Sequence, residues 1–124
     1  MEIIKTTNAP GAIGPYSQAV KHDGTVYTSG QIALDPATGA MSGETTAEQT
    51  ERVMKNLSAV LEAAGSGMDK IIKTTCFLSD IADFAAFNEV YGKYITNAPA
   101  RSCVAVRDLP RGAKVEVEAV AVAK

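Results

Sequence analysis

The sequence predicts an α+β fold, a two-layer sandwich in which one mixed β-sheet carries two helices on one of its faces. Two observations predict it. Segments with helical spacing of apolar residues alternate with short β-branched segments, in the order β-β-α-β-α-β-β. The 124 residues contain no internal repeat, linker or low-complexity tract. All of these elements are therefore expected to share one core, in a single domain that spans residues 1–124.

The N-terminal part consists of strands and turns. Residues 2–5 can form a short strand, and the prolines and glycines of the following stretch break regular structure until a strand starts near Gln18. The dipeptide Asp23-Gly24 predicts a hairpin turn between strands at 18–21 and 25–34. Another turn is expected at residues 35–39, where proline occupies a suitable position.

Two helices are expected in the middle of the chain. The first begins near Thr45, where the spacing to Glu48 is that of a capping box, and it ends at Gly65. A β-branched strand follows at residues 70–80. Asp80 is expected to cap the second helix and Pro99 to end it. Its predicted apolar face consists of Ile81, Phe84, Phe87, Tyr91 and Tyr94.

The last two strands, at residues 101–106 and 114–122, complete the sheet. In the final strand Val115, Val117, Ala119 and Ala121 point to one face, whereas Glu116, Glu118, Val120 and Val122 point to the other. If the helices cover the first face, the second still has valines to bury. A sheet that is apolar on both faces but covered on one predicts self-association.

Composition argues against several classes of protein. The chain is 46% hydrophobic and 21% charged, and its net charge of −2 includes no basic block of the kind that nucleic-acid or anionic-membrane binders carry. No apolar run approaches the ~20 residues that span a bilayer, and the N-terminus does not resemble a secretory signal. Cys76 and Cys103 match neither a metal site nor a disulfide scaffold. We therefore expect a cytoplasmic protein without metal or cofactor.

Arg101 is the first candidate site residue. It opens an apolar strand and shares a strand face with Cys103, Ala105 and Arg107. Burial without a partner would be costly, and a guanidinium is suited to bind a carboxylate through two hydrogen bonds. A ligand carboxylate and a structural ion pair account for this arginine about equally well.

Three further features could carry chemistry. Glu116 and Glu118 lie on one strand face roughly 6.6–7 Å apart, where a partly buried glutamate is a plausible proton carrier and a solvated pair is the ordinary alternative. Ser29-Gly30 interrupts a strand, which indicates either an ordinary bulge or a close approach of the backbone to a ligand. Cys103 fits a packed thiol better than a nucleophile, because His22, the one histidine, sits at a hairpin end.

Four motifs together resemble the RidA (YjgF-type) family of reactive imine deaminases. They are IGPYSQAV at 13–20, YTSGQI at 27–32, NAPARSCVAVRDLP at 97–110 and KVEVEAVAV at 114–122. The resemblance runs from end to end of the chain. It implies a chorismate-mutase-like α+β fold and a homotrimer with three sites in the clefts between subunits. It also implies hydrolysis of 2-iminopropanoate and 2-iminobutanoate, by-products of pyridoxal-phosphate enzymes, to 2-keto acids and ammonia.

The resemblance also assigns roles to residues. Arg101 would grip the substrate carboxylate, and Glu116 would position or activate the attacking water. Backbone groups around Gly30 and Cys103 would bond the substrate, while the pocket would be lined by Tyr16, Ser29 and Asn88. Ala98 stands where the family commonly has an aromatic residue, which leaves the preferred substrate size open.

Two other functions are compatible with the same motifs. A non-enzymatic module that binds small carboxylates such as 2-keto acids would need Arg101 but no proton carrier. An endoribonuclease or translation inhibitor, an activity also associated with the family, is disfavoured by the acidic net charge and the absence of a Lys/Arg stripe.

Overall fold

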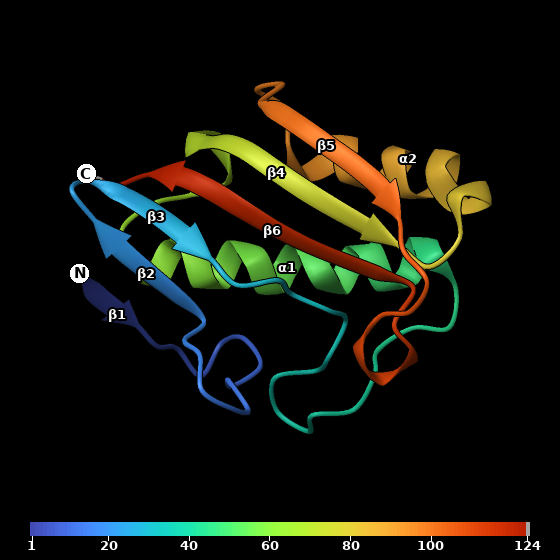
Figure 1. Cartoon of the computed structure of the whole chain (residues 1–124), viewed down its shortest axis with the longest axis horizontal. Helices are drawn as coiled ribbons and strands as arrows, with labels where there is room; N and C mark the ends of the chain where they lie inside the picture. The colour runs from blue at the N-terminus through green and yellow to red at the C-terminus, as the bar shows by residue number, and fades with distance from the viewer. Residues whose placement is uncertain (124) are drawn as a thin grey trace.

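A computed structural model, which describes residues 1–123, shows one six-stranded mixed sheet with two helices behind it (Figure 1). The sheet order is β1-β2-β3-β6-β4-β5, and only the β4–β5 pair is parallel. The predicted fold class is confirmed. The strands are β1 (Glu2–Ile4), β2 (Ala19–His22), β3 (Thr25–Thr28), β4 (Ile71–Leu78), β5 (Ala100–Ala105) and β6 (Val115–Val122), and the helices are α1 (Thr46–Ala63) and α2 (Phe84–Tyr94).

The core lies between the helices and the inner face of the sheet. β6 runs through the middle of the sheet, and its alternate residues Val115, Val117, Ala119 and Ala121 are buried as predicted. They meet the apolar face of α1, on which Val53, Leu57, Val60 and Leu61 are fully buried. Burial of this kind contributes about 25 cal/mol per Å² of apolar surface, so it is the main driving force for the two layers to pack.

Helix α1 begins and ends as the sequence predicts. The Thr45 hydroxyl accepts a hydrogen bond from the backbone N–H of Glu48, and the Glu48 carboxylate accepts from the backbone N–H of Thr45. Gly65 follows the last turn with φ +79, a conformation that a glycine adopts without steric cost. The backbone N–H of Glu44, which also donates to the Glu48 carboxylate, and that of Thr45 lower the pKa of the Glu48 carboxyl.

Helix α2 departs from the prediction at both ends. The Asp80 carboxylate caps a separate 3-10 turn, η2 (Ile81–Asp83), and α2 starts only at Phe84. Because residues 81–83 form a 3-10 turn, the 3.6-residue period of α2 does not extend back to Ile81. Ile81 is 57% exposed and Phe84 is 37% exposed, so neither belongs to the buried face. The helix ends at Tyr94, well before Pro99, where Ile95 turns to an extended conformation.

The N-terminal strands also differ in part. Residues 2–4 form the short strand that the sequence allows at 2–5, whereas the strand expected over 25–34 stops at Thr28. Gln31 then forms an isolated bridge to Val117. Because Tyr27 pairs with Val120 and Gln31 with Val117, residues 28–30 face only residues 118 and 119, which defines a bulge. The Thr28 hydroxyl replaces the missing ladder bond by accepting from Ala119 N at 3.0 Å.

The sheet face opposite the helices is uncovered, as the sequence predicts. The large apolar residues exposed on it are Ile3, Tyr27, Val104 and Val122, each at least 40% exposed. Within residues 1–123, neither helix has the length and apolar composition needed to cross a membrane.

The capping box gives a test of the fold. Replacing Thr45 with alanine leaves the N–H of Glu48 without its partner and should lower the free energy of unfolding by about 1 kcal/mol. Thr45→Ser keeps the hydroxyl and should restore most of the loss in urea-unfolding experiments. Equal losses in the two variants would show that the methyl group, not the cap, is responsible.

Candidate functional site

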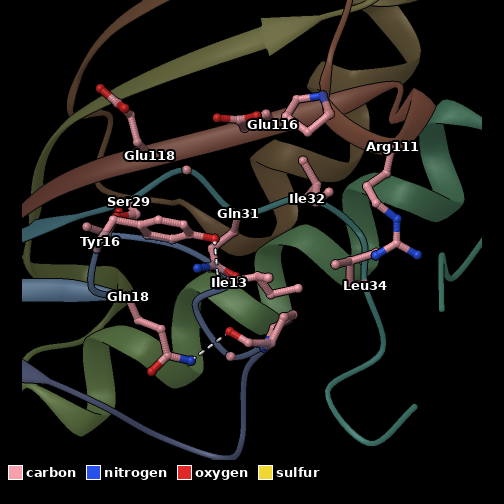
Figure 2. A pocket seen from close by; sticks show the side chains of 15 residues that line it. Ile13, Tyr16, Gln18, Ser29, Gln31, Ile32, Leu34, Arg111, Glu116 and Glu118 are labelled. Atoms are coloured by element: carbon pink, nitrogen blue, oxygen red, sulfur yellow. Dashed lines mark hydrogen bonds between the residues drawn. The ribbon is translucent and has the colours of Figure 1, made fainter. Parts of the chain in front are cut away.

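A cavity of about 770 Å³ opens where the N-terminal loop, the bulge of residues 28–30 and β6 meet. Glu116 and Glu118 project from β6 on one side of it, and Tyr16 and Ile13 face them from the loop (Figure 2). Apolar side chains of Ile32 and Leu34 and the turn at Pro110–Gly112 complete the wall. The cavity therefore combines an apolar lining with two carboxyl groups from one strand face, which is typical of small-molecule sites.

Gly30 and Glu116 are packed directly against each other. A methyl group placed on the Gly30 α-carbon would overlap the Glu116 carboxylate and would lie 2.7 Å from its Cδ atom. The backbone φ of Gly30 is not positive, so the reason for glycine here is space rather than conformation. The bulge predicted from Ser29-Gly30 is confirmed, and the group that approaches the backbone there is the Glu116 carboxylate. The approach of a ligand stays a prediction.

Glu116 is half-buried, and burial is the main reason why its pKa is raised above the ordinary value of 4.5. The like charge of Glu118, on the same strand face, raises the pKa further. A carboxyl group with a raised pKa is a better proton acceptor when ionised than an ordinary glutamate. The structure thus gives Glu116 the property expected of a proton carrier.

Ser29 and Tyr16 both line the cavity. The Ser29 hydroxyl donates to the backbone carbonyl of Ser17 at 2.5 Å, so its proton is used to tie the N-terminal loop to the bulge. The Tyr16 hydroxyl accepts from the N–H of Ile13 at 3.3 Å, and the residue is 53% exposed. Tyr16 is therefore held at the mouth of the cavity rather than in the core.

Arg101 lies elsewhere, on the helix side of edge strand β5. Its Nη1 donates to Asn88 Oδ1 at 2.6 Å, and its guanidinium lies 4.9 Å from the centre of the Tyr91 ring and 5.5 Å from that of Phe84. The Tyr91 ring is itself fixed by a 2.7 Å hydrogen bond between its hydroxyl and Thr74 Oγ1. These contacts orient the guanidinium and leave most of its donors free.

No carboxylate within residues 1–123 forms an ion pair with Arg101. The structural ion pair, which the sequence left as an equal alternative, is therefore absent from the described part of the chain. An oriented guanidinium without an anionic partner is suited to bind an anionic ligand.

Cys103 is half-buried beside Cys76, its register partner on β4. Burial raises the pKa of the Cys103 thiol, and it raises the pKa of Cys76 to about 12. Both groups are thus protonated near neutral pH and are poor nucleophiles. This supports a packed thiol, as the sequence favours. Across residues 1–123 no three His, Cys, Asp or Glu side chains converge as metal ligands would.

The predicted site residues form two groups on opposite faces of one sheet. Arg101 is in register with Thr74, a buried inward residue, whereas Glu116 is in register with Phe77 and points outward. Tyr16, Ser29, Gly30 and Glu116 line the cavity. Asn88 and Cys103 lie instead with Arg101, on the helix side of the sheet. One chain does not bring its own Arg101 and Glu116 to a common ligand.

The sequence reasoning missed several residues that shape these groups. Glu118 was a candidate beside Glu116 but was not assigned to the site, and it raises the pKa of its neighbour. Tyr91 was assigned to the core, yet its ring also supports Arg101. Arg111 also lines the cavity, and its backbone has a φ of +60. No pattern in the sequence pointed to this residue.

Comparison with known proteins gives consistent matches along the chain. A sequence model of the family described as Endoribonuclease L-PSP matches residues 6–123. The RutC family protein y4sK of Sinorhizobium fredii is 50% identical over 97% of this chain and 96% of its own. The human 2-iminobutanoate/2-iminopropanoate deaminase is 47% identical over 97% of this chain and 88% of its own. The crystal structure of Escherichia coli TdcF with bound serine superposes with a TM-score of 0.94, at 43% identity, and covers 100% of both chains.

The coupling between the two glutamates can be measured. Glu118→Gln removes a like charge and should lower the pKa of the Glu116 carboxyl toward 4.5, as followed by NMR titration of the side-chain carboxyl. Glu62→Gln, which makes the same charge change on α1, should leave that pKa unaltered. A wild-type Glu116 that already titrates at 4.5 would contradict the role of burial.

Proposed function

Because the chain belongs to the Endoribonuclease L-PSP (YjgF/RidA) family, we propose that it is a deaminase that hydrolyses 2-imino acids to 2-keto acids and ammonia. The observation that carries the proposal is the pair of prepared groups. One is an oriented guanidinium without an anionic partner, and the other is a half-buried glutamate packed against a glycine. The human relative named as such a deaminase supports the activity.

Arg101 binds the substrate carboxylate in this proposal. A 2-imino acid places its carboxylate next to the C=N carbon, so a bidentate contact with the guanidinium also fixes the position of the reacting carbon. The contact with Asn88 and the ring of Tyr91 hold the guanidinium in place before the ligand arrives. TdcF, whose structure contains bound serine, supports the binding of a small carboxylate.

Glu116 moves the proton. Water attacks the carbon of the protonated imine, and its proton passes to the Glu116 carboxylate while the electron pair of the C=N bond moves to nitrogen. Glu116 returns the proton to that nitrogen and the carbon–nitrogen bond breaks. Ammonia leaves with the hydroxyl proton as ammonium, and the 2-keto acid remains. A protonated imine is already electrophilic, so one positioned acid–base group, worth ~10²–10⁴-fold, meets the demand of the reaction.

The proposed active unit is a homotrimer with its sites between subunits. Arg101 and Glu116 of one chain face opposite ways, and the uncovered sheet face carries the exposed apolar residues Ile3, Tyr27, Val104 and Val122. A ring of head-to-tail contacts would cover that face and bring Arg101 of one copy to Glu116 of the next. Gly30, Ser29 and Tyr16 would line the cleft on one side, and Asn88 and the Cys103 backbone on the other.

The substrates point to a biological role. Pyridoxal-phosphate enzymes that dehydrate serine or threonine release 2-iminopropanoate or 2-iminobutanoate, and a cytoplasmic deaminase would remove these reactive by-products. The same site suits a second function, the non-catalytic binding of small carboxylates, which the serine in TdcF favours. Glu116 separates the two functions, because a binding module has no use for a proton carrier. Cleavage of RNA is disfavoured by the net charge of −2.

Single substitutions test the roles of the two residues. With 2-iminobutanoate generated in situ by a threonine dehydratase, Arg101→Ala should abolish the acceleration of keto-acid release while the assembly survives. Glu116→Gln should lower kcat by about 10²–10⁴-fold and keep the affinity for 2-oxobutanoate. Arg107→Ala, whose side chain is 97% exposed, is the matched control and should behave like the wild type. If the wild type does not accelerate release, the deaminase proposal fails, and retained binding would then favour the binding module.

A mixture of inactive variants tests the shared site. Co-expression of Arg101→Ala with Glu116→Gln should restore about a quarter of the wild-type activity, because random assembly leaves that share of interfaces with both native groups. The two variants purified separately should be inactive. Heterotrimers that form, as seen by mass spectrometry, but show no activity would contradict a site between subunits. A stable 13.0 kDa species in sedimentation would rule out the trimer itself.

A further inference from the structure

The wall of the cavity that carries Tyr16 has almost no packing of its own. It belongs to residues 5–18, which connect β1 to β2 beyond the pair Ile4–Ala19 without any helix or strand. Residues 11–16 are all exposed, and Ile13 is 79% exposed. Their internal bonds are the contact of Ile13 with the Tyr16 hydroxyl and a turn from Tyr16 N to Gly14 O. Ala9 is the one apolar residue of this loop that is buried in the core, so apolar burial does not hold residues 11–16 in place.

Within residues 1–123, the side chain that makes the most hydrogen bonds to this loop is the amide of Gln18. Gln18 is only 4% exposed, and its side chain reaches back across the loop. Oε1 accepts from the N–H of Thr6 at 2.8 Å, and Nε2 donates to the carbonyls of Thr6 at 3.0 Å, Pro10 at 2.8 Å and Ala9 at 3.3 Å. The amide thus bonds the Thr6 backbone through both its N–H and its C=O, as a neighbouring strand would, and holds residues 6–10 of the loop.

The backbone of Gln18 is tied to the other side of the cavity. Its carbonyl accepts from the N–H of Ser29 at 2.9 Å, and the preceding carbonyl, of Ser17, accepts from the Ser29 hydroxyl. Ser29 belongs to the bulge that also brings Gly30 against Glu116. Gln18 therefore connects the loop that carries Tyr16 with the segment that positions the carboxyl group.

We infer that Gln18 is a positioning residue, whose amide fixes the loop of residues 6–17 and so sets the place of Tyr16 over the cavity that contains Glu116. The kinetic consequence rests on the proposed function, whereas the effect on the loop does not. Tyr16, Gly11 and Gln18 line both this cavity and a second one of about 570 Å³ behind the loop. This loop therefore separates the two cavities, and without the hydrogen bonds of Gln18 it would border open space on both sides.

The side chain at this position must be both donor and acceptor. A methionine has nearly the same shape but offers no hydrogen bond, and it would leave the Thr6 N–H and three carbonyls without their partner. An asparagine keeps the amide but is one methylene shorter, so it cannot reach Thr6 and Pro10 at once. The two variants lose the anchor by different means, and Gln18→Asn serves if Gln18→Met does not fold.

The experiment compares Gln18→Met with Gln49→Met. Gln49 is an equally buried glutamine that also bonds two backbone groups, Gly43 O and Lys114 N, and neither group lines the cavity. Gln18→Met should speed hydrogen exchange at the amides of Thr6 and Tyr16. It should also lower kcat/KM about 10- to 100-fold, mainly through KM, because small displacements in a site are costly. Gln49→Met should lower the melting temperature to a similar extent and keep the wild-type KM.

The outcomes separate the inference from the proposed function. Unchanged exchange at Thr6 and Tyr16 in the Gln18 variants, with KM no higher than in Gln49→Met, would overturn the positioning role. A wild type without turnover would reject the deaminase instead. Hydrogen exchange would then decide the role of Gln18 alone, with faster exchange in residues 6–16 supporting it and wild-type exchange rejecting it.

Discussion

The mismatch between β3 and β6 is the constraint on which the candidate site depends. Three residues of one strand, 28–30, face only two of the other, so the ladder opens beside the middle strand of the sheet. The opening takes up the Glu116 side chain, and the absence of a side chain at Gly30 is what lets the carboxyl group lie there. Half-burial and the raised pKa of Glu116 follow from this position. The bulge therefore determines the chemistry as well as the shape of the cavity.

Buried amides hold the irregular segments around this opening. Gln18 pins the N-terminal loop, and Asn56 of α1 donates to the carbonyls of Ile32 and Leu34, which line the same cavity. Gln49, also on α1, makes the same kind of contact away from the cavity, where it connects Gly43 with Lys114. The N-terminal loop that Gln18 holds contains Pro10, Gly11, Gly14 and Pro15, and Ala9 is its one buried apolar residue. Hydrogen bonds to buried polar groups, whose loss would leave unpaired carbonyls, replace hydrophobic packing there.

The sequence was most informative where one local rule decides the structure. The Thr45 cap, the alternation in β6 and the turn at Asp23-Gly24 each depend on a few adjacent residues, and each is found as predicted. The predicted start of α2 was wrong, because a 3-10 turn capped by Asp80 precedes the helix and shifts its buried face. The division of Arg101 and Glu116 between two faces could not be read locally either, since it depends on the register of β5, β4 and β6.

That division has a physical consequence for the proposed reaction. If Arg101 and Glu116 shared one face of the protomer, two strands apart, they could pair with each other. The pair would occupy the guanidinium, and the positive charge would lower the pKa of the Glu116 carboxyl. Because the two residues lie on opposite faces, the Arg101 guanidinium packs on the Tyr91 ring with its N–H donors free of a carboxylate. Glu116 has a pKa that burial raises. In the proposed trimer the two groups meet only across a subunit boundary, where the substrate carboxylate occupies the guanidinium. Separation within the chain thus keeps both groups in the state that the reaction requires.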